Sequence, residues 1–94
     1  EGAIDEQTAY GKTISGIAQL CKKHNKPLII ICGKMSNNLQ ELYNKGVSAI
    51  FSISNGFASK EEAFSAAAEN IKITMQNIAR TIILLKPQAR KKYL

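Results

Sequence analysis

The sequence has 94 residues, a net charge of +6 and a hydrophobic content of 45%, which suits one small domain and is too little for two. Its longest apolar run, residues 28–32, is far shorter than a membrane-spanning helix. The amino terminus is acidic and does not have the layout of a signal peptide. We therefore expect a cytoplasmic protein without a membrane partner, in which Cys21 and Cys32 are reduced core residues.

The positive charge is concentrated at the carboxyl end. Four basic residues lie in residues 86–94, which leaves nine basic against seven acidic residues in the remainder. No aromatic residues interleave with them, as a stacking surface for nucleic acid would require. We predict that residues 87–94 form a basic solvated tail and do not expect a nucleic-acid partner; an RNA contact through this tail is the alternative.

The first expected element is a helix that begins near Thr13 or Ser15 and ends before Pro27, because its apolar residues recur at helical spacing. Gly16 is expected to let this helix approach a sheet closely. Residues 28–32, LIIIC, indicate a strand. Since polar and apolar residues do not alternate in it, we predict burial on both faces, as in a parallel sheet.

A short helix is expected next, at about residues 39–45. Asn37 or Asn38 is the predicted N-cap, and Gly46 is the predicted left-handed residue after the helix. Residues 47–53, VSAIFSI, are typical of a second strand.

The last expected element is a long helix. Residues 59–62, SKEE, match a capping box, and the apolar spacing continues to about Leu85, before Pro87. We expect a break near Glu69 and Asn70, because the apolar stripe before them does not join the stripe after them.

The order of loop, helix, strand, helix, strand and helix is typical of an α/β fold. Two apolar parallel strands need further strands beside them and helices on both faces. We therefore predict part of a larger parallel sheet, incomplete as a stand-alone sheet, with a missing strand that leads into Glu1.

Residues 1–13, EGAIDEQTAYGKT, carry the strongest functional signal. Gly11, Lys12 and Thr13 look like the end of a phosphate-binding P-loop. The P-loop pattern G-x-x-x-x-G-K-[ST] requires a glycine at the position of Glu6, so the pattern fails. Another explanation is needed for this segment.

Ligands of open parallel sheets bind at the carboxyl ends of the strands. Three loops are expected to converge there, at residues 1–12, 33–38 and 52–56. In the first of them, Asp5 can hold Mg²⁺ or accept a proton from a substrate hydroxyl, and Glu1 can share the metal.

Three further side chains in the first loop favour a polar ligand. Gln7 and Thr8 offer neutral hydrogen bonds, and Lys12 adds a positive charge beside the free N–H groups of a helix start. Together these groups fit phosphoryl transfer or carboxylate recognition. A solvated acidic loop that caps the following helix is the alternative.

The pattern E-G-x-I-D-x-Q-T-x-x-G-K at residues 1–12, with G-I-A at residues 16–18, resembles the signature of the bacterial type-1 glycerate kinases. The similarity continues in order through KPLIIICG, GVSAIFSIS and ENIKITMQNIAR. It implies that residues 1–86 are the carboxyl-terminal part of a Rossmann-like domain in a longer enzyme. It also implies a reaction in which ATP, with Mg²⁺, phosphorylates a hydroxyl of glycerate.

The resemblance also implies which residues lie at the active-site cleft. The positions that match the motif are Glu1, Gly2, Asp5, Gln7, Thr8, Gly11 and Lys12. We expect Asp5 to act as base or Mg²⁺ ligand and Lys12 to pair with a phosphate or carboxylate, while the others bind substrate. Three positions depart from the family: Ala3 is often arginine, Ile14 is usually proline, and Tyr10 is commonly a small residue.

The leading expectation is therefore a fragment of a glycerate kinase. We predict that this chain alone is inactive, because most of the substrate and nucleotide surface would lie in the missing amino-terminal portion. The alternative is a non-catalytic α/β module or kinase remnant that binds a protein partner or, through its basic tail, nucleic acid.

Overall fold

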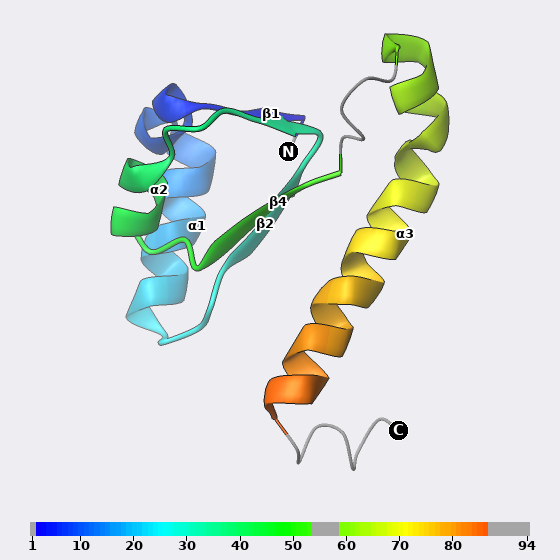
Figure 1. The fold of residues 1–94 in the computed structure, drawn as a ribbon. Coiled ribbons are helices and arrows are strands. Elements are labelled where there is room, and N and C mark those ends of the chain that lie inside the picture. The colour runs from blue at the N-terminus through cyan, green and yellow to red at the C-terminus, as the bar shows by residue number, and fades with distance from the viewer. Residues whose placement is uncertain (1, 54–58, 87–94) are drawn as a thin grey trace. The chain divides into compact units, whose positions relative to one another are not determined.

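A computed structural model describes residues 2–53 and 59–86 (Figure 1). Two compact units, Glu1–Ser54 and Asn55–Leu94, divide the chain. The first contains β1 (Ala3–Ile4), η1 (Glu6–Tyr10, a 3₁₀ helix), α1 (Lys12–Lys23), β2 (Ile29–Cys32), β3 (Lys34–Met35), α2 (Gln40–Asn44) and β4 (Ala49–Ser52). The second contains α3 (Lys60–Leu85). The basic tail predicted at residues 87–94 lies outside the described residues.

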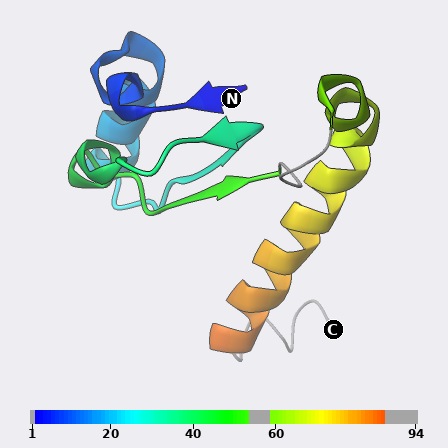
Figure 2. The same cartoon turned by 45° about the horizontal axis from the view of Figure 1, so that its top comes forward.

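The strands of the first unit pair in parallel, in two short ladders. β2 pairs with β4, with Ile30 opposite Ile50, and β1 pairs with β3. Figure 2 shows that β3 follows directly after β2, and only Gly33 separates the two strands. The predicted α/β class and its parallel strands are confirmed, and the two open ladders agree with a partial Rossmann-like sheet.

One apolar cluster forms the core of the first unit and draws a residue or two from nearly every element. Its buried members are Ile4, Ala9, Ala18, Ile30, Cys32, Leu39, Leu42, Val47 and Ile50. The two cysteines remain thiols, Cys32 buried as predicted and Cys21 half-buried. The burial of Ile4 and Ala9 fixes the segment around η1 against the same core as the strands.

The prediction that residues 28–32 are buried on both faces is wrong for this chain. Ile30 and Cys32 are only 6% and 1% exposed, whereas Ile29 is 37% exposed and Ile31 is half-buried. Successive residues of a strand point to opposite faces of the sheet. The core cluster therefore covers one face of β2 and leaves the other more open to solvent.

The helices of the first unit agree with their predicted positions within a few residues. α1 begins at Lys12 and ends at Lys23, before Pro27. The predicted N-cap of α2 is wrong: the cap residue is Leu39, which makes no side-chain capping bond. Gly46 has a φ of +115°, as predicted for the residue that ends this helix.

α3 begins with the predicted capping box. The Ser59 hydroxyl accepts a hydrogen bond from the Glu62 N–H, and the Glu62 carboxylate accepts one from the Ser59 N–H. The break predicted near Glu69 and Asn70 is wrong, because α3 is continuous to Leu85. A phase shift of the apolar stripe leaves the backbone hydrogen bonds intact, and neither glycine nor proline interrupts the helix.

Within the described ranges, no helix combines the length and apolarity that a membrane crossing requires. The predicted close approach of Gly16 to the sheet is also wrong: a Cβ built on Gly16 would meet nothing within 4 Å. The glycine at a close backbone contact is Gly33, where a Cβ would lie 2.7 Å from the Gly2 carbonyl oxygen. Gly33 is therefore the residue that allows β1 to lie against β3.

Candidate functional site

The candidate site begins at the amino end of η1, where Asp5 and Thr8 cap each other. The Asp5 carboxylate accepts a hydrogen bond of 2.9 Å from the Gln7 N–H, and the Asp5 N–H donates one of 3.0 Å to the Thr8 hydroxyl. These bonds form a capping box, which satisfies backbone groups at the start of η1. The side chains of the motif are therefore held by the motif's own backbone.

The segment between β3 and α2 lies beside η1. The Asn38 side-chain amide donates a hydrogen bond of 3.4 Å to the Glu6 carboxylate, and this bond links two residues that are 32 positions apart. Both segments follow parallel strands that pair with each other, β1 and β3. The loops predicted to converge at residues 1–12 and 33–38 therefore do so.

Two adjoining hollows lie between these segments. The first, which we call the η1–α2 pocket, has a volume of about 450 Å³. It is lined by Glu6, Gln7, Tyr10, Asn38, Leu39, Gln40, Glu41 and Leu42. The second, which we call the Asp5 pocket, has a volume of about 370 Å³. It is lined by Asp5, Glu6, Gln7, Ser36, Asn37 and Asn38.

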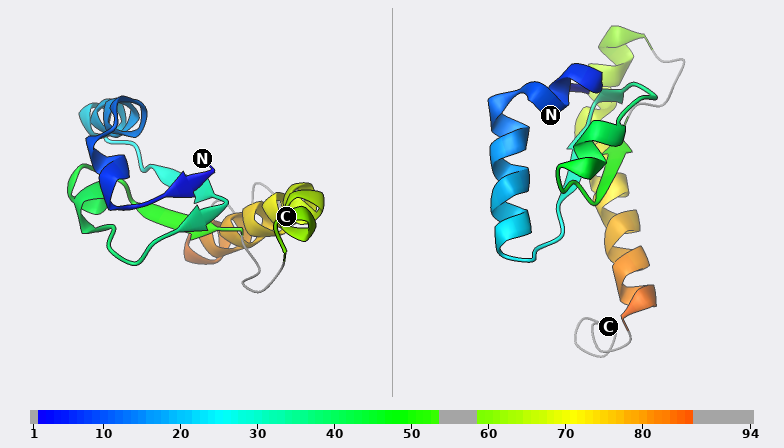
Figure 3. Two further views of the ribbon diagram at one scale, coloured as in Figure 1. Left: turned by 90° about the horizontal axis from the view of Figure 1, so that it is seen from above. Right: turned by 90° about the vertical axis from the view of Figure 1, so that its left-hand side faces the viewer.

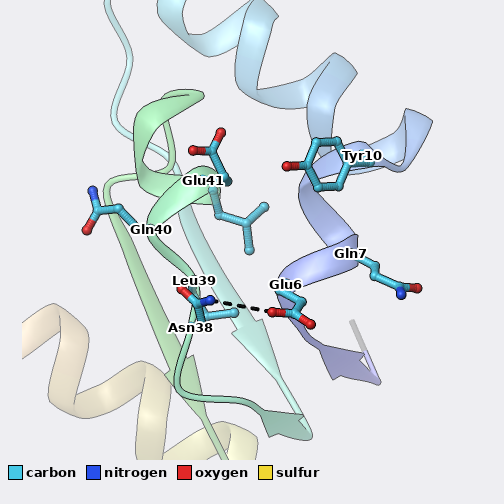
Figure 4. Close-up of a pocket in the computed structure, with 8 residues that line it drawn as sticks. Glu6, Gln7, Tyr10, Asn38, Leu39, Gln40 and Glu41 are labelled. Carbon is cyan, nitrogen blue, oxygen red and sulfur yellow. Dashed lines mark hydrogen bonds between the residues drawn. The ribbon is translucent and has the colours of Figure 1, made fainter.

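Figure 4 shows the two walls of the η1–α2 pocket. Tyr10 projects from η1 toward the wall that carries Glu41, whereas Gln7 and Gln40 project away from the space between the walls (Figure 4). The right-hand view of Figure 3 shows η1 running directly into α1. The bulky ring of Tyr10, at a position that is commonly a small residue in the family, thus forms part of the pocket wall.

Most of the residues that line the two hollows are polar, and several are acidic. The lining includes the carboxylates of Glu6 and Glu41 in one hollow and those of Asp5 and Glu6 in the other, and neither lining set contains lysine, arginine or histidine. Carboxylates and side-chain amides accept and donate hydrogen bonds to hydroxyl groups, and carboxylates ligate Mg²⁺. This chemistry suits a hydroxyl-bearing or cation-bound ligand better than a bare anion.

The structure brings together only part of the predicted site. Asp5 and Gln7 line the hollows, but Thr8, Gly11 and Lys12 line neither of these two. The Thr8 hydroxyl accepts the Asp5 N–H in the capping box. Lys12 is the exposed first residue of α1.

The two glycines of the motif have backbone roles. Gly11 ends η1 and is the N-cap of α1. The Gly2 carbonyl accepts a hydrogen bond of 3.1 Å from the Lys34 N–H, at the start of the ladder between β1 and β3. Glu1 lies outside the described residues.

The loop predicted after the second strand is described only at its start. The Ser52 hydroxyl donates a hydrogen bond of 3.2 Å to the Gly33 carbonyl, which joins the end of β4 to the turn between β2 and β3. Residues 54–58 of that loop lie outside the described ranges.

The side chains at the start of η1 show how far this part of the chain could ligate Mg²⁺. Among the residues whose placement is described, no group of three or more aspartate, glutamate, histidine or cysteine side chains could hold a metal. Asp5 and Glu6 both line the Asp5 pocket. Mg²⁺ is commonly held by one or two carboxylates together with water and substrate phosphates, so these residues fit a partial ligand set.

Several pocket residues were not predicted as site residues. Ser36, Asn37 and Asn38 lie in the loop at residues 33–38 that was expected at the site, where Asn37 or Asn38 was interpreted only as a helix cap. Gln40 and Glu41 lie in the first turn of α2. Their polar character was visible in the sequence, but only the pairing of β1 with β3 places them opposite η1.

The comparisons with known proteins agree on one family. The family model described as "Glycerate kinase family" matches residues 1–83. A glycerate kinase of Bacillus cereus is 47% identical over 79 residues, 84% of this chain and 21% of that protein. A glycerate kinase of Bacillus subtilis is 42% identical over 86 residues, 92% of this chain and 22% of that protein.

A protein of Escherichia coli named glycerate 2-kinase is 36% identical over 84 residues, 89% of this chain and 22% of that protein. No solved structure matches the chain at a significant level. The chain thus spans about a fifth of the length of these relatives. Because the family model covers most of its residues, the chain belongs to the glycerate kinase family.

Proposed function

We propose that this chain is part of a glycerate kinase, in which the intact protein transfers the γ-phosphoryl group of ATP to a hydroxyl of glycerate. The observation that carries this proposal is the family match over residues 1–83, which includes the motif at β1 and η1. The polar hollows beside η1 support it, because their lining suits a substrate that carries hydroxyl groups.

In this proposal, Asp5 accepts the proton that leaves the attacking hydroxyl, or holds Mg²⁺ at the transferred phosphoryl group. Gln7 binds a substrate hydroxyl at the same hollow. Thr8 supports Asp5, since its hydroxyl lies 3.0 Å from the Asp5 N–H and 3.5 Å from the Asp5 carboxylate.

Lys12 is the proposed partner of a phosphate or carboxylate. As the exposed first residue of α1, it stands beside helix N–H groups, which favour negative charge. Magnesium, when bound, would neutralise charge on the phosphates, and Asp5 is the protein ligand we propose for it.

We propose that this chain packs against the other residues of a longer enzyme, similar in length to its relatives. We also propose that this enzyme is cytoplasmic. The more open face of β2 and β4 supports the proposed packing, since Ile29 and Phe51 are 37% and 39% exposed. Parallel sheets are normally covered on both faces. We therefore expect no ATP-dependent phosphorylation of glycerate by the 94-residue chain alone.

A segment exchange tests the proposed function. The 79-residue segment of the Bacillus cereus relative that aligns with this chain is replaced by the corresponding residues of this chain. ADP release with glycerate is then measured in a coupled assay, and phosphorus NMR identifies the phosphorylated hydroxyl. We expect glycerate-dependent turnover in the exchanged protein and none in the isolated chain.

The variant Asp5→Asn in the exchanged protein tests the proposed role of this carboxylate. Loss of a general base lowers rates by about 10²- to 10⁴-fold, and asparagine keeps the capping geometry. Glu69→Gln, at an exposed position in α3, is the matched control and should retain full turnover. A folded exchanged protein without turnover would contradict the proposed function, and full activity of Asp5→Asn would contradict the role of Asp5.

A further inference from the structure

Among the residues that the structure describes in the first unit, Lys45 is the lysine whose ammonium group contacts other side chains and a backbone carbonyl. Its ammonium donates hydrogen bonds to the Ala9 carbonyl and, at 3.4 Å, to the Ser15 hydroxyl. The same nitrogen lies 5.1 Å from the centroid of the Tyr10 ring, within the range of a cation–π contact. Lys45 itself is half-buried. One side chain therefore contacts the last two residues of η1, Ala9 and Tyr10, and Ser15 in the first turn of α1.

These contacts join the two walls of the η1–α2 pocket. Lys45 is the residue that ends α2, whose first turn carries the wall residues Gln40 and Glu41. Ala9 and Tyr10 are the last two residues of η1, which forms the opposite wall. The bond from Lys45 to Ala9 spans 36 positions of sequence, and like the Asn38–Glu6 bond it links η1 to the segment that contains α2.

We propose that Lys45 is a positioning residue that fixes the separation of the pocket walls and the place of the Tyr10 ring. The Ala9 carbonyl stands at the end of a helix, where carbonyl groups lack intrahelical partners. Ser15 also donates to it, at 2.9 Å. An ammonium group has three donors and a full charge, so it can serve the carbonyl, the hydroxyl and the ring face together.

The alternative is that Lys45 only adds to the stability of the whole unit. The two roles differ in which amides they protect. Loss of a positioning contact frees η1 and leaves the β2–β4 ladder intact, whereas a loss of global stability raises exchange throughout the unit. The N–H groups of Thr8 and Gly11, which bond to Asp5 and Thr8, report on η1, and that of Ile53, which bonds to Cys32, reports on the ladder.

The test is amide hydrogen exchange, followed by NMR, on the 94-residue chain and its Lys45→Met variant, which keeps the length of the side chain and removes its donors. We expect exchange at Thr8 and Gly11 to rise about tenfold, because hydrogen bonds from a charged donor are lost, while exchange at Ile53 is unchanged. Lys23→Met, at an exposed position at the end of α1, should change neither. Unchanged exchange at Thr8 and Gly11, or an equal rise in exchange at Ile53, would overturn the proposal.

A second measurement needs no substitution. Acetylation of the unmodified chain, followed by mass spectrometry, compares the reactivity of Lys45 with that of the exposed Lys23. We expect Lys45 to react several-fold more slowly, because its nitrogen is engaged by Ala9, Ser15 and Tyr10. Equal rates would also overturn the proposal.

The consequence for substrate rests on the proposed function. In the segment-exchanged kinase, Lys45→Met is expected to raise the KM for glycerate by more than it lowers kcat, because it loosens the pocket walls and does not remove the carboxylate of Asp5. If the parent exchanged protein is inactive, the proposed function fails while the exchange and acetylation results still decide the role of Lys45.

Discussion

The substitution Gly33→Ala tests whether the approach of β1 to β3 depends on the absence of a side chain. An alanine Cβ at this position would lie 2.7 Å from the Gly2 carbonyl oxygen. That oxygen belongs to the backbone and accepts the Lys34 N–H at 3.1 Å. It cannot move away without lengthening this hydrogen bond, so the substitution acts directly on the ladder that carries the motif.

The expected cost follows from three terms. Overpacking against backbone costs about 1–3 kcal/mol, and loss of one hydrogen bond costs about 0.5–1.5 kcal/mol. Alanine recovers about 0.4–1 kcal/mol by restricting the unfolded chain, because the φ of Gly33 is not in the left-handed region. The net effect is a decrease of about 2 kcal/mol in the free energy of unfolding, taken from the middle of these ranges.

Urea unfolding followed by circular dichroism measures this change. With an m-value of about 1 kcal/mol/M for a chain of this size, the midpoint should fall by about 2 M. Gly16→Ala is the matched control, because it lies within α1 and its new Cβ would meet nothing within 4 Å. It should raise the free energy of unfolding by about 0.5–1 kcal/mol. A Gly33→Ala midpoint at or above that of the parent chain would refute the reasoning.

Three further substitutions have expected results in the same assay. Gly46→Ala places a side chain at a φ of +115° and should cost about 1–2 kcal/mol; an unchanged midpoint would mean that this turn relaxes freely. Ser59→Ala removes the capping box of α3 and should cost about 1 kcal/mol, with a loss of helical signal that Lys60→Ala, the control, does not produce. Leu42→Ala, at a side chain 1% exposed, should cost about 2–5 kcal/mol, and a smaller loss would indicate that the core collapses around the cavity.

Most of the fold was predictable because its signals are local. The apolar spacing that predicts α1 and α3, the S-x-x-E box before α3 and the glycine after α2 each act within a few residues. β1 and β3 were not predicted, since each has only two residues and depends on the other for its hydrogen bonds. Such a pairing leaves no periodicity in either segment.

The candidate site shows the same division between local and distant contacts. The alternative interpretation of the first loop, in which acidic side chains cap the following helix, is not met at α1, whose N-cap Gly11 makes no side-chain bond; Asp5 instead caps η1 within the loop. The motif predicts Asp5 and Gln7 as site residues, and Gln7 lines both hollows and Asp5 one of them. The contacts of Glu6 with Asn38 and of Lys45 with Ala9 join positions 32 and 36 residues apart, and no sequence pattern specifies such pairs.

Asp5 both caps η1 and lines a hollow. A loss of activity in an Asp5 variant can therefore come from either role. An alanine at this position removes the cap from the Gln7 N–H as well as the carboxylate. The resulting loss of activity would follow from a displaced η1 even if Asp5 never met substrate. Asparagine accepts the same backbone hydrogen bond about as well as aspartate but cannot take a proton or hold Mg²⁺ with a negative charge. A large effect of Asp5→Asn with unchanged exchange at Thr8 and Gly11 would therefore assign the effect to the chemistry of the carboxylate.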